Sequence, residues 1–412
     1  MERPVTIDPR YHDAALFDLD AVVIDPNSAT TLLRRLKKAG IATAVYSKSR
    51  GGHQVLRERG LADLFDLCVD GAEEACHQLR TDPRRSVVFS DDPAGIEQGR
   101  SAGFAVVIGV DRTGHADELL ERGADAVVAD LADIELRTGD KRMSELPNAL
   151  ESYQQLGLAG RQLFVCLDYD GTLSEIVPDP DSATLAEGAN EALEQLAARC
   201  PVAILSGRDL ADIRTRVGIE DIWYAGSHGF ELTGPDGSHH QNDAAASAVS
   251  VLETAADELR RDLEPIPGVR VEHKRFAVAV HYRNVAPDRV AEVVAAAHRR
   301  GRRHGLRVTG GRKVVELRPN IDWDKGTALR WLADRIQQSG RTLPIYIGDD
   351  LTDEDAFDAI RSDGIGIVVR HGEDGGRPTA ATFTLNNPTE VAEFLRRVAD
   401  SPARRRRSPT EP

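Results

Sequence analysis

The chain contains one arrangement twice: an apolar strand that leads into two aspartates separated by a single residue. The four aspartates are Asp18, Asp20, Asp168 and Asp170. In each half, the next predicted strand ends in serine and a later one ends in paired aspartates. These residues are Ser47, Asp91 and Asp92 in the first half, and Ser206, Asp349 and Asp350 in the second. Two tandem copies of one α/β fold explain the repetition better than coincidence.

Strand-like and helix-like segments alternate between these landmarks. Apolar runs rich in β-branched residues predict strands at 14–24, 41–47, 86–92, 105–110, 161–173, 201–208, 313–319, 343–350 and 364–369. Helical periodicity predicts helices over 29–40, which ends at Gly40, and over 190–200. Such alternation implies parallel sheets with crossover helices on both faces. We therefore predict an α/β protein with two tandem Rossmann-like parallel-sheet domains, the second carrying an inserted α+β cap.

A chain of 412 residues is too long for one ordinary domain. Within the insertion, an alternating strand at 276–284 and a helix at 288–305 interrupt the regular pattern. The polar stretch after about 137 predicts a linker, and the Pro-rich end predicts a disordered tail. The expected domains are 1–140, a linker at 141–158, a core at 159–232 and 313–400, a cap at 233–312 and a tail at 401–412.

Charge and composition exclude several classes of protein. Lys plus Arg number 52 against 67 Asp plus Glu, a net charge of −15, which argues against nucleic-acid binding. A local cluster of cations still permits a small anionic substrate. The first 25 residues are too acidic for a signal peptide, and no apolar run approaches the ~18 residues of a membrane helix. The four scattered cysteines fit no disulfide framework. We expect a reduced cytoplasmic protein without membrane attachment or an obligate protein partner.

Two carboxylates follow the strand that opens the second half. Asp168 and Asp170 lie at its carboxyl end, where open α/β sheets bind their ligands, and Gly171 allows a sharp turn there. Aspartate is a hard oxygen ligand suited to Mg²⁺, and its carboxylate can also attack phosphorus. A turn rich in Asp and Gly, without any function, explains this motif alone equally well.

Three later segments are ambiguous singly and specific together. Ser206 with Gly207 is suited either to holding a phosphoryl oxygen or to capping a helix. Lys325 begins a helix, where a lysine is ordinarily a solvated surface residue. Asp349 and Asp353, in GDDLTDEDAF, suit cation binding, but Thr352 and Asp355 of the same run also fit a capping box at a helix N-terminus. All these segments in this order at strand ends are improbable by chance.

With these segments in place, residues 160–400 resemble the haloacid dehalogenase-like phosphatases, and more narrowly the trehalose-6-phosphate phosphatases. The resemblance rests on LDYDGTL, ILSGR, GSHGFE, VAVHYRN, KVVELRP, WDKGTAL and GDDLTDEDAF. It implies a haloacid dehalogenase-like fold and Mg²⁺-dependent hydrolysis of trehalose 6-phosphate through an aspartyl-phosphate. Three alternatives stay open: a phosphatase of another sugar phosphate, a non-catalytic sugar-phosphate sensor, and a phosphomutase.

The resemblance also implies roles for single residues. Asp168 is the nucleophile, and Asp170 is the acid and then the base. The phosphoryl group is held by Ser206, Gly207 and Lys325. Mg²⁺ is held by Asp168, the backbone carbonyl of Asp170 and Asp349, with Asp350 and Asp353 in support. The implied sugar contacts are His228, Glu272, Lys274, His281, Arg283, Glu316 and Arg318.

Strand alternation gives part of the sugar site a pattern of its own. It puts His281 and Arg283 on one face of the strand at 276–284, and Glu316 and Arg318 on one face of the strand at 313–319. A less buried sheet face and a structural ion pair explain these patterns as well. Glu, His and Lys side chains are suitable partners for sugar hydroxyls.

The first half lacks parts of the same motif set. Ala21 follows Asp20 where the second half has glycine, and no lysine precedes the strand at 86–92. Only Arg84 and Arg85 stand there, and a guanidinium is not equivalent to an ammonium at a tight phosphate site. We therefore predict that the N-terminal domain is catalytically inactive.

Overall fold

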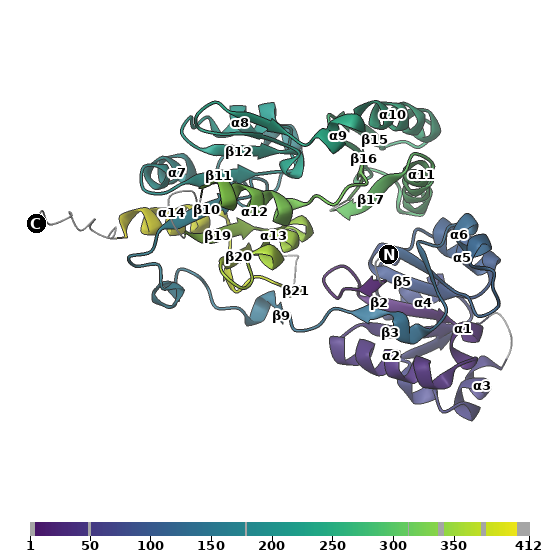
Figure 1. Cartoon of the computed structure of the whole chain (residues 1–412). Helices are drawn as coiled ribbons and strands as arrows, with labels where there is room; N and C mark the ends of the chain where they lie inside the picture. Colours follow the sequence, from purple (N-terminus) through teal and green to yellow (C-terminus); the bar gives the residue numbers. More distant parts are fainter. Residues whose placement is uncertain are drawn as a thin grey trace, which may run out of the picture. The chain divides into compact units, whose positions relative to one another are not determined.

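The computed structural model describes residues 5–47, 51–177, 179–311, 313–336, 342–371 and 376–401. It is a mixed α/β structure built on parallel sheets, which confirms the predicted fold class (Figure 1). The chain divides into two compact units: Met1–Gly139, Thr254–Glu272 and Val278–Arg318, and Asp140–Glu253, His273–Ala277 and Pro319–Pro412. The predicted tail from residue 402 onwards, and residue 312, lie outside the described residues. Within those residues, no helix is both long enough and apolar enough to cross a membrane.

The N-terminal sheet is parallel, with the order β4-β3-β2-β5-β6-β7. Its strands are β2 (Ala14–Asp18), β3 (Ala42–Tyr46), β4 (Leu67–Val69), β5 (Ser86–Ser90), β6 (Val106–Val110) and β7 (Ala126–Val128). Ala15 and Phe17 of β2 pack with α2 (Pro26–Ala39), and the alternate residues Ala14 and Leu16 pack with α4 (Ala72–Leu79) and α5 (Pro93–Ser101). Helices therefore cover both faces of this sheet, as the alternation predicts.

The predicted strand at 14–24 is only half right. β2 ends at Asp18, and α1 (Leu19–Val23) follows it directly. The side chains of Leu19, Ala21 and Val22 are buried in the same core as α2. Packing onto neighbouring elements thus overrides the β-propensity of this valine-rich segment.

The large sheet of the second unit has the order β14-β13-β12-β11-β10-β19-β20-β22. Its strands are β10 (Leu163–Leu167), β11 (Val202–Leu205), β12 (Trp223–Gly226), β13 (Glu231–Thr233), β14 (His239–Gln241), β19 (Leu343–Gly348), β20 (Ile365–Val369) and β22 (Phe383–Leu385). The six strands from β12 to β22 are ordered like the six strands of the N-terminal sheet. In each sheet the third strand, β10 or β2, is the one that leads into the two aspartates separated by one residue. This repeat of strand order confirms the tandem α/β folds.

Alternate residues of β10 again divide the core in two. Val165 and Leu167 pack with α7 (Ala189–Ala197), α8 (Leu210–Val217) and α14 (Pro388–Asp400). Phe164 and Cys166 pack with α12 (Lys325–Ile336) and α13 (Glu354–Ala359). Because β10 is buried from both faces, its carboxyl end is a rigid platform for whatever follows it.

A separate four-stranded sheet has the order β15-β16-β18-β17. Its strands are β15 (Arg270–Lys274), β16 (Ala277–His281), β17 (Leu306–Gly311) and β18 (Val314–Pro319), and α10 (Val249–Leu263) and α11 (Val290–Arg303) accompany them in the chain. This differs from the expected boundaries in two places. Residues 313–319 were expected in the core, but their strand β18 pairs with β16 of this sheet. Residues 233–241 were expected in the cap, but β13 and β14 pair antiparallel with β12 and with each other, and so extend the core sheet.

The expected linker at 141–158 is a packed part of the core unit. Its strand β9 (Lys141–Arg142) pairs with β21 (Pro378–Thr379). The buried side chains of Met143, Leu146 and Tyr153 join the core clusters, and the Tyr153 hydroxyl donates a 3.0 Å hydrogen bond to the carbonyl of Arg397. Polar residues between these widely spaced apolar ones give the segment its linker-like composition.

One buried histidine makes the stability of the N-terminal sheet depend on pH. The Nδ1 atom of His12 accepts a 3.1 Å hydrogen bond from the amide of Asp8, and burial lowers the pKa of His12 to about 4. Because the folded state keeps this ring neutral, its contribution is complete above pH 6.5 and is lost as the pH falls toward 4. We expect a loss of about 2 kcal/mol between pH 7 and pH 5.

His12→Asn tests this expectation, since an amide oxygen can replace Nδ1 as the acceptor. Urea unfolding at pH 7 and pH 5 should show a smaller pH dependence for this variant than for the wild type. His77→Asn, at an exposed position of α4, is the matched control. Equal pH dependence in all three proteins would contradict the assignment.

Candidate active site

A buried ion-paired cluster lies at the carboxyl end of β10. Asp168 follows this strand directly, and Lys325 begins α12 on the neighbouring layer. The Lys325 Nζ lies 3.0 Å from Asp168 Oδ2 and 2.6 Å from Asp353 Oδ1. The Lys325 side chain is only 2% exposed. The two motifs, 157 residues apart in the chain, thus meet as the predicted site requires.

Asp353 is fully buried, and both of its carboxylate oxygens accept hydrogen bonds from other residues. Its Oδ1 accepts hydrogen bonds from Lys325 and from the Tyr346 hydroxyl, both at 2.6 Å. Its Oδ2 accepts from the amides of Asp349 and Asp350, both at 2.9 Å. Asp353 therefore organises the loop after β19 and holds Lys325 in place. The predicted alternative of a helix cap also applies nearby, because Asp350 caps the turn Leu351–Asp353.

The cluster combines three carboxyl groups, those of Asp168, Asp349 and Asp353, with the one ammonium of Lys325. Burial raises the pKa of Asp168 well above its usual range, although Lys325 opposes the shift. Burial also raises the pKa of Asp349, to about 7. Burial alone would lower the pKa of Lys325, but the carboxylates of Asp168 and Asp353 raise it, so the lysine stays cationic. One ammonium among three carboxylates leaves a site that favours a further cation.

Two oxygens of this cluster suit a divalent cation. Carboxylate oxygens of Asp168, Asp349 and Asp353 all lie within 4.8 Å of one another. The Oδ1 atoms of Asp168 and Asp349 are buried and accept no hydrogen bond from any described residue. Such buried oxygens are costly unless a ligand satisfies them, and hard oxygen donors are what Mg²⁺ prefers. The residues present therefore fit the predicted Mg²⁺.

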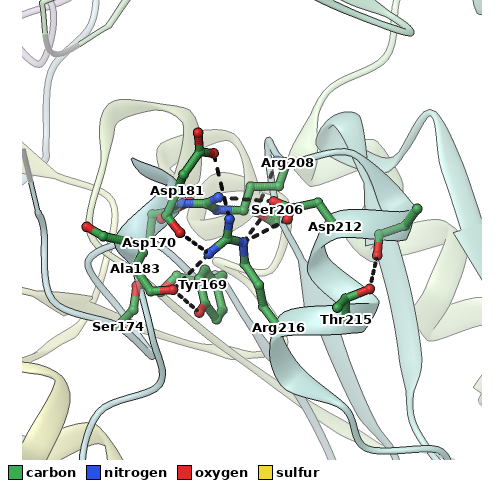
Figure 2. Close-up of polar contacts among 12 residues, drawn as sticks. Tyr169, Asp170, Ser174, Asp181, Ala183, Ser206, Arg208, Asp212, Thr215 and Arg216 are labelled. Atoms are coloured by element: carbon green, nitrogen blue, oxygen red, sulfur yellow. Dashed lines mark hydrogen bonds and ion pairs between the residues drawn. The ribbon is translucent and has the colours of Figure 1, made fainter. Parts of the chain in front are cut away.

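Asp170 leaves the cluster and points to α8 and its N-terminal loop. Its carboxylate, 47% exposed, receives two hydrogen bonds from Arg208: Nε to Oδ2 at 2.7 Å and Nη2 to Oδ1 at 2.6 Å (Figure 2). The structure thus separates the environments of the two motif aspartates. Asp168 is buried beside an ammonium, and Asp170 is half-exposed beside a guanidinium.

The predicted phosphate-binding residues lie at the end of the adjacent strand. Ser206 follows β11, which pairs with β10, and its hydroxyl is buried. The carbonyl of Ser206 accepts a 2.8 Å hydrogen bond from the amide of His228. A Cβ at Gly207 would lie 2.8 Å from His228 Nε2, so any other residue there would have to displace the His228 ring. The structure therefore brings His228 beside Ser206 and Gly207.

The other predicted sugar-binding residues belong mostly to the four-stranded sheet. His281 Nε2 lies 2.8 Å from Glu272 Oε2, and Arg318 Nε donates to Glu316 Oε2 at 2.6 Å. Glu316 is opposite Ala279 in the β16–β18 register, and therefore shares a face with His281. Lys274 shares a face with Glu272, two residues earlier on β15.

Arg283 departs from the predicted pattern. β16 ends at His281, so strand alternation does not extend to Arg283, which is exposed in the following turn. The aspartate cluster belongs to the second compact unit and most of the four-stranded sheet to the first, although His273, Lys274, Ala277 and Pro319 of the sheet fall within the second.

Comparison with known proteins places the chain. Residues 166–389 match the family described as trehalose-phosphatase. The trehalose-phosphate phosphatase of Mycobacterium leprae (strain TN) is 56% identical over 423 residues, which cover 96% of this chain and 98% of that protein. The protein of the same description from Mycobacterium tuberculosis (strain ATCC 25618 / H37Rv) is 55% identical over 401 residues, 96% of each. The chain belongs to the trehalose-phosphatase family.

A solved structure supports the same placement. The C-terminal domain of the Candida albicans trehalose-6-phosphate phosphatase superposes with a TM-score of 0.51 at 25% identity, covering 62% of this chain and 98% of that one. Membership makes the chain an enzyme of the trehalose-phosphatase family, a phosphoric monoester hydrolase. The recognised resemblance is confirmed.

Two contacts in this trehalose-phosphatase-family site were not predicted. His371, just after β20, donates a 3.0 Å hydrogen bond from Nε2 to the Gly171 carbonyl and lies 3.3 Å from Asp349 Oδ2. Arg208 binds Asp170, as described above. Arg208 could have been found, because it completes the ILSGR motif. No sequence pattern marks His371. It lies near Asp349 because β20, which it follows, pairs in parallel with β19, the strand that leads into Asp349.

Gly171 is a site where a single methyl group should have a large effect. Its φ is +76°, and an added Cβ would lie 2.1 Å from Asp349 Oδ2. We expect Gly171→Ala to displace Asp349 and reduce kcat/KM for a sugar phosphate by about 100-fold. Gly157→Ala is the control, since it also has positive φ but no atom within 4 Å. Equal activity losses in the two variants would show that backbone strain, and not the contact with Asp349, is responsible.

Proposed function

We propose that this chain hydrolyses trehalose 6-phosphate to trehalose and phosphate, with Mg²⁺ and an aspartyl-phosphate intermediate. The observation that carries the proposal is Asp168: a buried carboxylate with one oxygen against Lys325 and the other unbonded among the described residues. This is the arrangement expected of an activated carboxylate nucleophile. The substrate comes from the description of relatives that share over half of their residues with this chain.

Asp168 attacks the phosphorus atom, and the bond from phosphorus to the sugar oxygen breaks. Asp170 gives its proton to the departing oxygen, which leaves as the trehalose hydroxyl. Water then attacks the aspartyl-phosphate, Asp170 takes a proton from it, and phosphate leaves as the Asp168 carboxylate is restored. Lys325 and Ser206 bind the phosphoryl oxygens and reduce their repulsion of the nucleophile.

The metal would be held by the unbonded oxygens of Asp168 and Asp349 together with the carbonyl of Asp170. When bound there, Mg²⁺ would neutralise charge on the phosphoryl oxygens. Asp350 and Asp353 support the site from the loop that presents Asp349. Asp353 does so through its contact with Lys325.

We assign sugar recognition to His228 and to the polar face of the four-stranded sheet. That face carries the Glu272–His281 pair and Glu316, which offer acceptors and a donor to hydroxyl groups. Other sugar phosphates share the phosphoryl chemistry, so this face is the part of the proposal that decides the substrate.

We further propose that the N-terminal domain is catalytically silent. Its Asp18 lies beside Ser90 at 3.4 Å, and burial together with Asp91 raises the pKa of Asp18 to about 6. Before β5, where a phosphate-binding lysine would be expected, the chain has two arginines that form other ion pairs. Arg84 pairs with Asp82, and Arg85 pairs with Asp13. These pairings leave neither guanidinium in the role that Lys325 has in the second domain.

Four free thiols support a reducing compartment, and we place the reaction in the cytoplasm.

Release of phosphate from trehalose 6-phosphate, with Mg²⁺ and with EDTA, tests the proposal beside a panel of other sugar phosphates. Selective, metal-dependent release would support it fully. Turnover of another ester only would retain the chemistry and refute the substrate. Product analysis by NMR distinguishes hydrolysis from transfer of phosphate within the sugar. Binding without turnover of any ester would favour a sensor and overturn the proposal.

A further inference from the structure

The Arg208 guanidinium binds both carboxylate oxygens of Asp170. The two parallel hydrogen bonds of 2.6 and 2.7 Å fix both the position and the plane of the carboxylate (Figure 2). Asp170 itself is nearly half-exposed, whereas the Arg208 side chain is 10% exposed. The buried partner therefore sets the geometry of the exposed one.

Arg208 is in turn held from several sides. Its Nη1 donates to Asp212 Oδ2 at 3.0 Å, and its guanidinium lies over the ring of Tyr169, 5.4 Å from the centroid. Its amide donates to the Ser206 hydroxyl at 3.2 Å, and its carbonyl accepts from the amide of Ser227 at 2.7 Å. Backbone and side chain are thus both constrained, so the guanidinium has little freedom to move.

A second arginine completes a chain of alternating charges. Arg216 binds both oxygens of Asp212 through Nε, at 2.8 and 2.9 Å, and its Nη1 donates to the carbonyls of Asp181 and Ala183 (Figure 2). The order Asp170, Arg208, Asp212, Arg216 alternates in sign along this chain. It ties Asp170 to α8, whose residues Leu210, Ile213 and Val217 are buried in the core, and to the loop before α7.

We infer that Arg208 is a positioning residue that holds the Asp170 carboxylate in place for proton exchange with the substrate oxygen and with water. The inference rests on the proposed function, since it assumes that Asp170 exchanges these protons. An exposed aspartate on a turn would otherwise sample several rotamers, and proton transfer requires a defined distance to the reacting oxygen. Asp212 has a supporting role, because it limits rotation of the guanidinium.

A double-mutant cycle tests whether Arg208 acts through Asp170. The variants are Arg208→Gln, Asp170→Asn and both together, measured by single-turnover phosphate release from trehalose 6-phosphate. We expect each single change to lower the rate by about 100-fold or more, and the double variant to be no more than a few-fold slower than Asp170→Asn. Losses that multiply would overturn the inference, because Arg208 would then act independently of Asp170.

The leaving group provides a second readout, which a merely structural role would not move. p-Nitrophenolate departs without help from an acid, whereas a sugar alkoxide needs the proton. We expect Arg208→Gln to lower kcat/KM strongly for the sugar phosphate and by less than about threefold for p-nitrophenyl phosphate, since only the former transfer uses the acid. Equal losses for both esters would show a damaged phosphate site, and would overturn the inference.

Two further variants complete the design. Arg208→Lys keeps the positive charge but loses the bidentate contact with Asp170, and should recover only part of the rate lost in Arg208→Gln. Arg214→Ala, at an exposed position of α8, should keep the wild-type rate. Thermal unfolding checks that every variant is folded. If the wild type hydrolyses a different sugar phosphate, the substrate proposal fails and the same cycle on that ester still decides the role of Arg208.

Discussion

Replacing Asp168 with asparagine is expected to lower the rate of phosphate release by at least about 10⁴-fold, since loss of a nucleophile removes the covalent pathway. Asparagine has nearly the same shape as aspartate, but its amide does not attack phosphorus. The buried Asp168 carboxylate lies 3.0 Å from Lys325, which keeps Asp353 as a second counterion after the change. Single-turnover assays with trehalose 6-phosphate measure the loss.

The fold should survive this substitution. Burial disfavours the Asp168 charge, as its raised pKa indicates, so a neutral amide is expected to change the free energy of unfolding by no more than about 2 kcal/mol in either direction. Asp18→Asn, at the carboxyl end of β2, is the matched control and should leave activity unchanged. Activity that survives Asp168→Asn but disappears with Asp18→Asn would assign the chemistry to the N-terminal domain.

Removing the Lys325 ammonium should affect both activity and stability. In Lys325→Met, the buried carboxylates of Asp168 and Asp353 lose the cation between them. Breaking a buried ion pair by deleting one partner costs about 3–5 kcal/mol, and we expect a loss of unfolding free energy in that range. Phosphate release should fall at least about 100-fold, because the cation that stabilises the phosphoryl oxygens is gone.

The stability deficit of Lys325→Met should depend on pH in a defined direction. Burial alone would raise the pKa of Asp353, but Lys325 now holds it below its usual value; without the ammonium, the pKa values of Asp168 and Asp353 should both lie above their unfolded values. Such a group stabilises the folded state at low pH, and that contribution is lost as the pH rises through the folded pKa. The deficit measured by urea unfolding should therefore be smaller at pH 5.5 than at pH 8.

A second substitution separates charge from packing in this cluster. Adding Asp353→Asn to Lys325→Met removes one of the two carboxylates that lost their counterion, and should restore part of the stability without restoring activity. Lys38→Met, at an exposed position in the last turn of α2, should change stability by less than about 0.5 kcal/mol. A Lys325→Met protein as stable as the wild type at pH 8 would contradict the buried pairing.

Much of the architecture could be predicted because its signals are local. Strand period, helix period and glycine stops are read within about ten residues, and they correctly indicated the parallel strands of the two large sheets and the end of α2 before Gly40. The aspartates, Ser206 and Lys325 were found because each directly follows a strand or begins a helix. Parallel strands bring their carboxyl ends to one edge, so the order of motifs predicts their meeting. The roles assigned to these residues stay predictions.

The errors share one cause: they depend on partners that are distant in the chain. The segment Leu19–Val23 is a helix because of what it packs on, β18 belongs to the four-stranded sheet because of its partner β16, and the expected linker is part of the core because of β21 and α14. Composition alone does not identify such partners.

The sequence by itself determined the tandem α/β architecture, the family and the set of residues at the strand ends, since period and motif order are properties of the chain. Only the tertiary structure decided which carboxylate is buried beside the ammonium and which is held by a guanidinium. Asp168 and Asp170 are two residues apart and chemically identical. Lys325 and Arg208 reach them from different elements, and it is burial and the neighbouring charge that make the two aspartates different.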